Sequence, residues 1–173
     1  MEPLVHALIP LVFLLAVFPK LDKKYIFLLV PIVWIIDLDT YFGQHRFTLH
    51  NIFFVLLVAA LLYVLWDKMA GLVGFFYGFS HLLLDSFYPG PAWLYPFVDR
   101  TFYITSQVLR DGEWIVNLGW GSLALSDYVA FAETVGPSRY IAETGVLFVV
   151  LIGILLVVKY RKNITSFVSS KGP

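Results

Sequence analysis

Five long apolar stretches constrain this chain more than any other feature of its sequence. They cover about residues 3–19, 25–42, 48–66, 70–88 and 141–160. A helix that crosses a bilayer needs roughly 20 mostly apolar residues, and each stretch comes close to that length. The chain is also 60% hydrophobic and only 14% charged, whereas a soluble domain is about half apolar and a quarter charged. We therefore expect an all-α polytopic membrane protein with about five transmembrane helices.

The segment at 89–140 differs from these stretches in its prolines, glycines and charges. Residues 101–118 alternate loosely around Asp111-Gly112, which is typical of a β-hairpin, and residues 119–135 predict an amphipathic helix at the membrane interface. We expect a single membrane domain, 1–173, with a small extracytoplasmic hairpin and interfacial-helix insertion between the fourth and fifth spans. This insertion is either a fixed cap or a lid, on which Arg100 or Arg110 meets a phosphate.

The distribution of basic residues predicts the orientation. Eight of the twelve Lys and Arg residues fall on one side of the five predicted spans, which the positive-inside rule makes cytoplasmic; they are Lys20, Lys23, Lys24, Lys68, Lys159, Arg161, Lys162 and Lys171. We therefore expect a multi-pass protein of the cell membrane, with its amino terminus outside and its carboxyl terminus in the cytoplasm. The amino-terminal stretch lacks a basic region and a cleavage site, and is interpreted as a retained span.

Two classes of site are disfavoured by composition. The net charge is zero, so nothing indicates a nucleic-acid partner, and the absence of cysteine excludes disulfides and thiolate metal sites.

Ionisable residues inside spans are costly and usually mark a pathway or a site. Here they gather toward one end of the predicted spans: His6, Asp37, Asp39, His45, Arg46, His50, His81 and Asp85.

Imidazole and carboxylate groups together are the ligand set of zinc and similar divalent metals. His81 and Asp85 are four residues apart, so a helix projects them from one face. Asp37 and Asp39 share a face only where the helix ends or bends, and His45 and His50 flank a helix start with Thr48 as a candidate N-cap. We expect one or two ions, zinc first and Mn²⁺ or Mg²⁺ as alternatives; the predicted ligands are His6, Asp37, Asp39, His45, His50, His81 and Asp85.

Other interpretations of these residues stay open. His81 and Asp85 alone could be a buried pair that fixes helix packing. Asp37 and Asp39 could be a helix-end pair at the interface, which Arg46 neutralises. A lone histidine at the position of His6 is more often interfacial than ligating.

Three motifs carry a resemblance to a known family. They are Asp37-Leu38-Asp39, then His45-Arg46-Phe47-Thr48-Leu49-His50, then Gly78-Phe79-Ser80-His81-Leu82-Leu83-Leu84-Asp85. In this order they resemble the membrane-bound metal-dependent hydrolases, also described as LexA-binding, inner-membrane-associated hydrolases. The resemblance covers roughly residues 1–97, and His6 is similar to the family's first-span histidine. The family often reads H-R-x-x-T-H-S, whereas here Thr48 comes one place early and Asn51 replaces the serine.

Two functions of different class follow. The first is a metal-dependent hydrolase at the outer membrane surface that cleaves a phosphoester or ester of a membrane lipid by a metal-activated water, with Arg46 and Asp39 as catalytic residues. The alternative is a divalent-cation binding or transport protein without hydrolase activity. A carrier needs polar residues along its path, but residues 52–65 and 70–79 offer only Tyr63 and Tyr77, which favours the enzyme. The sequence leaves the oligomeric state open.

Overall fold

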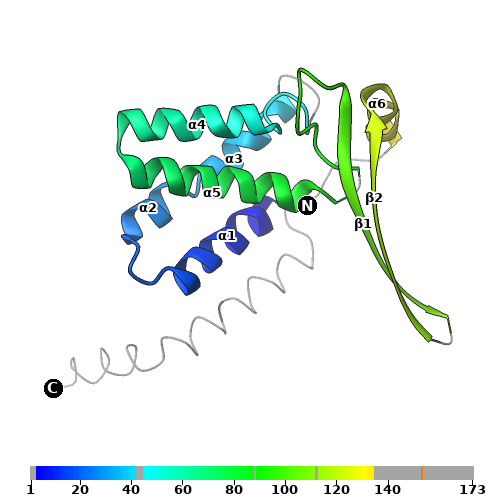
Figure 1. Ribbon diagram of the computed structural model, residues 1–173, viewed down its shortest axis with the longest axis horizontal. Helices are drawn as coiled ribbons and strands as arrows, with labels where there is room; N and C mark the ends of the chain where they lie inside the picture. The colour runs from blue at the N-terminus through cyan, green and yellow to red at the C-terminus, as the bar shows by residue number, and fades with distance from the viewer. Residues whose placement is uncertain (1–2, 42–44, 88, 112, 135–152, 154–173) are drawn as a thin grey trace.

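The computed structural model describes residues 3–41, 45–87, 89–111, 113–134 and 153. Its elements are, in chain order, α1 (Pro3–Val17), α2 (Lys23–Leu28), α3 (Ile32–Ile36), the 3₁₀ helix η1 (Asp37–Tyr41), α4 (Ile52–Leu65), α5 (Lys68–Asp85), β1 (Arg100–Asp111), β2 (Glu113–Ala124) and α6 (Leu125–Thr134). Helices α4 and α5 lie side by side, α1 contacts α5 at an angle, and the hairpin of β1 and β2 projects away from these three helices (Figure 1).

The predicted all-α polytopic fold is wrong for the described residues. Among them, no helix has both the length and the apolar character needed to cross a membrane, and a two-stranded antiparallel sheet accompanies the helices. The first apolar stretch forms a helix of 15 residues, about 22 Å long, against a hydrocarbon core of about 30 Å. The predicted orientation depended on these spans and loses its basis with them.

The second and fourth stretches depart from a span for different reasons. The second stretch divides into α2, α3 and η1, because Pro31 supplies no backbone N–H to continue α2. The fourth stretch forms α5, whose 18 residues include three glycines, His81 and Asp85. These residues make α5 less apolar than a membrane-spanning helix. The fifth stretch, 141–160, lies outside the described residues except for Gly153.

The core lies between α5 and the helices of the amino-terminal half. One buried cluster joins α1, α2 and α3 to α5 through Leu14, Ile26, Val33 and Val73, and the buried Tyr77 donates its hydroxyl hydrogen to the carbonyl of Ile26 at 2.7 Å. A second cluster, formed around Ile36, Val55 and Leu82, joins α3, α4 and α5. This second cluster lies at the ends of α3 and α5 where the polar residues begin.

Small residues allow α4 and α5 to approach closely. A Cβ atom added at Gly78 would lie 2.9 Å from Val55 Cγ1, and one at Gly71 would lie 2.8 Å from Tyr63 Cβ. Both contacts are shorter than side chains tolerate, so the glycines of α5 set the spacing between the two helices.

The predicted hairpin is confirmed. Strands β1 and β2 pair antiparallel from Arg100↔Ala124 to Asp111↔Glu113. The helix predicted over 119–135 begins only at Leu125, because residues 119–124 continue β2. Gly90 has φ +72°, and a Cβ there would lie 2.0 Å from the carbonyl oxygen of Phe102, so only glycine lets the 89–92 turn lie against the base of β1. That the segment is extracytoplasmic stays a prediction.

Candidate metal centre

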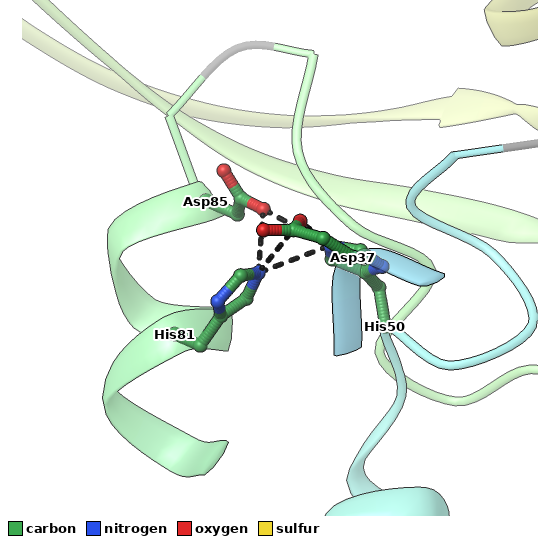
Figure 2. Close-up of side chains that lie close together, drawn as sticks. All are labelled: Asp37, His50, His81 and Asp85. Atoms are coloured by element: carbon green, nitrogen blue, oxygen red, sulfur yellow. Dashed lines mark hydrogen bonds and ion pairs between the residues drawn. The ribbon is translucent and has the colours of Figure 1, made fainter. Parts of the chain in front are cut away.

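The predicted site residues come together from four parts of the chain. His6 lies on α1, Asp37 and Asp39 on η1, His45, Arg46 and His50 on the loop before α4, and His81 and Asp85 on the last turns of α5. Figure 2 shows Asp37, His50, His81 and Asp85 pointing toward one another. His50, His81, Asp39, Asp85 and His6 are all buried.

The break between α3 and η1 brings two carboxylates to one imidazole. A 3₁₀ helix turns about 120° per residue, so residues two apart point about 120° from each other. Asp37 Oδ1 thus lies 3.4 Å from His50 Nε2, while Asp39 Oδ2 lies 2.7 Å from His50 Nδ1. The change from α-helix to 3₁₀ helix at Asp37 supplies the bend that the two aspartates require, and the His50 ring lies between the two carboxylates.

Four donor atoms form a compact group suited to a metal ion. Asp37 Oδ1, His50 Nε2, His81 Nε2 and Asp85 Oδ2 all lie within 4.8 Å of one another. The two Nε2 atoms are 3.1 Å apart, and each lies 3.2–3.4 Å from an oxygen of Asp37 and of Asp85. A tetrahedral ion with bonds of about 2.0–2.1 Å separates its donors by about 3.3–3.4 Å. The separations of the two imidazole nitrogens from each other and from the two carboxylate oxygens therefore fit tetrahedral coordination.

The second oxygen of Asp85 is held by groups outside this donor set. Arg46 Nη2 donates to Asp85 Oδ1 at 3.0 Å, and His6 Nε2 lies 3.2 Å from the same oxygen. The His6 ring also stacks on the His81 ring with centroids 4.4 Å apart. His6 therefore contacts two members of the cluster without being one of its four donors, and its predicted role as a ligand stays a prediction.

A second group of donors lies on the other side of His50. Asp39, His45 and His50 also offer atoms within 4.8 Å of one another, with His45 Nδ1 3.2 Å from Asp39 Oδ1. The His45 side chain is 39% exposed, unlike the donors of the first group. The two groups share the His50 ring and use its opposite nitrogens.

The electrostatics of the cluster are those of carboxylates paired with cations. Burial raises the pKa of Asp39, but hydrogen bonds from His45 and His50 outweigh it and bring that pKa to about 2. Burial lowers the pKa of His50, but hydrogen bonds to the three aspartates outweigh it and raise that pKa to about 10. The pKa of Asp85 is likewise held well below its usual value. Binding of a divalent cation here would therefore compete with protonation of the imidazoles.

The loop that carries His45, Arg46 and His50 is fixed at both ends. Arg46 has φ 74°, a left-handed conformation uncommon for residues other than glycine, and its carbonyl accepts from Ala92 N at 3.0 Å. At the other end the N-cap of α4 is Asn51, whose side chain accepts from Phe54 N at 2.9 Å. The expected N-cap at Thr48 is therefore wrong; the signal for Asn51 was its position directly before the apolar run.

One residue near the site was missed as a site component. Tyr128 of α6 is buried, donates its hydroxyl hydrogen to the carbonyl of His45 at 3.2 Å, and packs edge-on against Phe47. No local sequence pattern connects Tyr128 with His45, because the two residues are 83 positions apart. This contact attaches α6 to the loop that carries the histidines.

Comparison with known proteins supplies the family. A family model described as "YdjM inner membrane protein" matches residues 1–163. The chain belongs to this family. No curated protein and no solved structure matches the chain.

Membership in the YdjM family confirms the coarser part of the resemblance, which is that this is a chain from an inner-membrane protein family. The description names no reaction, so the hydrolase activity and the LexA association stay predictions. Within this YdjM-family chain the match spans all four regions that supply the cluster.

Proposed function

We propose that this protein is a metal-dependent hydrolase that cleaves a phosphoester or ester of a membrane lipid. The observation that carries the proposal is the group of four donor atoms from Asp37, His50, His81 and Asp85, with Arg46 beside it. Paired carboxylate and imidazole donors at this spacing are the ligands of catalytic divalent ions in many hydrolases.

Zinc is the ion that we expect, with Mn²⁺ or Mg²⁺ as alternatives. Two imidazole nitrogens favour zinc over magnesium, which prefers oxygen ligands in octahedral geometry. When bound, such a cation supplies Lewis acidity and brings the pKa of a water toward about 7. Asp37, His50, His81 and Asp85 would hold it.

The side chains of Arg46 and Asp37 each have an atom that could take part in hydrolysis. Arg46 Nη1 is buried and makes no hydrogen bond within the part of the chain that the structure describes, and neither does Asp37 Oδ2. A guanidinium nitrogen left over after pairing with Asp85 can donate to an ester or phosphate oxygen as negative charge develops. The Asp37 oxygen can accept the proton of an attacking water.

The lipid part of the proposal is supported by the surface near the site. Asp37 is the most exposed of the four donors, at 21%, and Leu38 and Tyr41 of the same 3₁₀ helix are exposed apolar residues. Phe87, two residues after Asp85, is exposed as well. An amphiphilic substrate could keep its tails on such a surface while its head reaches the donors.

The expectation that Arg100 or Arg110 meets a phosphate stays a prediction. Arg100 Nη1 donates to Ser122 Oγ at 2.8 Å, and the side chain of Arg110 lies outside the described residues.

A second candidate is a divalent-cation binding protein without hydrolase activity. Four protein ligands fill a tetrahedral sphere, which is typical of structural zinc, whereas catalytic zinc keeps an open position. The hydrolase would require room for a water or a substrate oxygen beside the four donors, and Asp37 is the most exposed of them.

The test is hydrolysis by the purified full-length protein loaded with zinc. The substrates are a chromogenic phosphodiester, a chromogenic carboxylic ester and a phospholipid in mixed micelles. We expect turnover that a chelator abolishes and zinc restores, and that His81→Ala lacks. The matched control is Leu72→Ala, which changes an exposed side chain of the same helix. Stoichiometric zinc without turnover of any of the three substrates would favour the binding protein.

A further inference from the structure

The His50 ring is bounded by a carboxylate at each of its nitrogens. Its Nε2 faces the four-donor group, 3.4 Å from Asp37 Oδ1 and 3.2 Å from Asp85 Oδ2. Its Nδ1 faces away from that group and lies 2.7 Å from Asp39 Oδ2. Both His50 and Asp39 are fully buried, so no bulk water competes for this contact.

A neutral imidazole coordinates a metal through one nitrogen and carries its proton on the other. If Nε2 coordinates, Nδ1 must carry the proton, and a partner at 2.7 Å can only accept it. A carboxylate in this position fixes the tautomer, holds the ring plane and raises the basicity of the coordinating nitrogen. Asp39 has this position, whereas Asp37 and Asp85 are on the coordinating side.

The competing arrangement uses the second group of donors. There an ion would bind Asp39, His45 and His50 Nδ1, and His50 Nε2 would carry the proton. That group offers three donors instead of four, and one of them, His45, is partly exposed. The first group is the more complete and the more deeply buried.

We infer that Asp39 is a positioning residue, which accepts the Nδ1–H of His50 and so directs Nε2 toward the metal. The other oxygen of Asp39, Oδ1, accepts a hydrogen bond from the partly exposed His45 at 3.2 Å. This second bond fixes the orientation of the Asp39 carboxylate. This role rests on the proposed metal site and deepens it, because it separates Asp39 from the ligands among which the sequence placed it.

The first arm of the test reads the His50 ring directly. Imidazole ¹⁵N NMR is recorded on zinc-loaded, full-length protein labelled at histidine; the chain has only four histidines, and single substitutions assign them. We expect His50 to show a coordinated Nε2 and a protonated Nδ1. A coordinated Nδ1 with a proton on Nε2 would overturn the inference.

The second arm compares substitutions at Asp39 and Asp37. Asp39→Asn keeps the shape of the side chain and removes its charge. We expect it to retain one zinc per chain with a dissociation constant raised about 10–100-fold, and to leave the cobalt absorption spectrum unchanged because the ligands are unchanged. Asp37→Asn should alter the cobalt spectrum. The control is Asp22→Asn, an exposed helix cap whose side chain bonds Lys24 N, which should change neither quantity.

The outcomes separate this inference from the proposed hydrolase. A cobalt spectrum altered by Asp39→Asn in the manner of Asp37→Asn would make Asp39 a ligand and overturn the positioning role. A wild-type protein that binds no zinc would overturn the role together with the site. Zinc on His50 Nε2 with no hydrolysis of any ester would support the role of Asp39 and refute the hydrolase. Where Asp39→Asn fails to fold, the ¹⁵N spectrum of the wild-type protein decides.

Discussion

His50 and His81, 31 residues apart in the sequence, point their Nε2 atoms at each other across 3.1 Å. Two buried imidazole nitrogens at this distance, with a carboxylate oxygen of Asp37 and one of Asp85 3.2–3.4 Å from each, leave the space of one small cation between them. This relationship connects the loop before α4 to the end of α5.

His81→Ala should remove the stabilisation that zinc gives. Zinc at 100 times its dissociation constant stabilises the folded wild-type protein by about 2.7 kcal/mol, which raises the melting temperature of a chain of this length by about 5–10 °C. The variant lacks a ligand and should show little of this shift. The measurement is thermal unfolding with and without zinc. An equal shift in both proteins would mean that zinc stabilises them from another place.

Arg46→Lys should separate binding from catalysis. A lysine keeps the charge but lacks the planar fork of the guanidinium, so its one nitrogen cannot occupy both the position of Nη2 against Asp85 and the position of Nη1 toward a substrate oxygen. We expect zinc content to remain at the wild-type level while the turnover of the phosphodiester falls about 10²–10³-fold. Wild-type turnover in this variant would show that Arg46 only neutralises Asp85.

Asn51→Ala should weaken both the fold and the site. Loss of an N-cap costs about 1 kcal/mol, and a melting temperature lower by about 2–4 °C is expected. Because Asn51 follows His50 directly and also donates to the carbonyl of Thr48 at 2.7 Å, zinc affinity should fall too.

Asp67→Ala is the matched control for this cap. Asp67 caps α5 at the end remote from the cluster, accepts from Ala70 N at 2.9 Å, and also bonds the hydroxyl of Tyr25. Its loss should lower the melting temperature without changing zinc affinity. If both caps changed zinc affinity equally, the effect of Asn51 would be general destabilisation.

Gly78→Ala should act on the site through helix packing. The added Cβ would lie 2.9 Å from Val55 Cγ1, so α4 and α5 must separate, at a cost of about 1–3 kcal/mol. Gly78 lies one turn before His81, and the separation should lower zinc affinity as well as stability. Denaturant unfolding and zinc titration measure the two effects, with Leu72→Ala as the exposed control. An unchanged free energy of unfolding and an unchanged zinc affinity would show that α4 and α5 accommodate the added methyl group without separating.

The sequence predicted which polar residues lie close together better than it predicted the architecture that holds them. Residue chemistry and spacing were enough to select Asp37, His50, His81 and Asp85, because an i, i+4 pair and a motif order depend on local geometry. Apolar composition, in contrast, indicated spans for segments that break at Pro31 or end after 15 residues. Asp37 and Asp39 contact opposite nitrogens of the His50 ring. Which nitrogen each carboxylate contacts depends on tertiary packing, and the spacing of the residues in the sequence does not show it.

The hairpin was predictable from the local sequence, whereas its connection to the site was not. The Asp111-Gly112 pair predicted the turn between β1 and β2 because its chemistry is local. The position of α6 was not predictable, since it depends on the contact of Tyr128 with the carbonyl of His45, made between segments far apart in the chain. The length of β2, which extends to Ala124, is set by pairing with β1 and was therefore underestimated.

Elemental analysis of the purified full-length protein tests the central claim most directly. The protein is loaded with zinc, freed of unbound metal by desalting, and compared with His81→Ala and with Leu72→Ala treated in the same way. We expect one zinc per chain in the wild type and in Leu72→Ala, and much less than one in His81→Ala. No stoichiometric metal in the wild type, or an equal amount in His81→Ala, would contradict it.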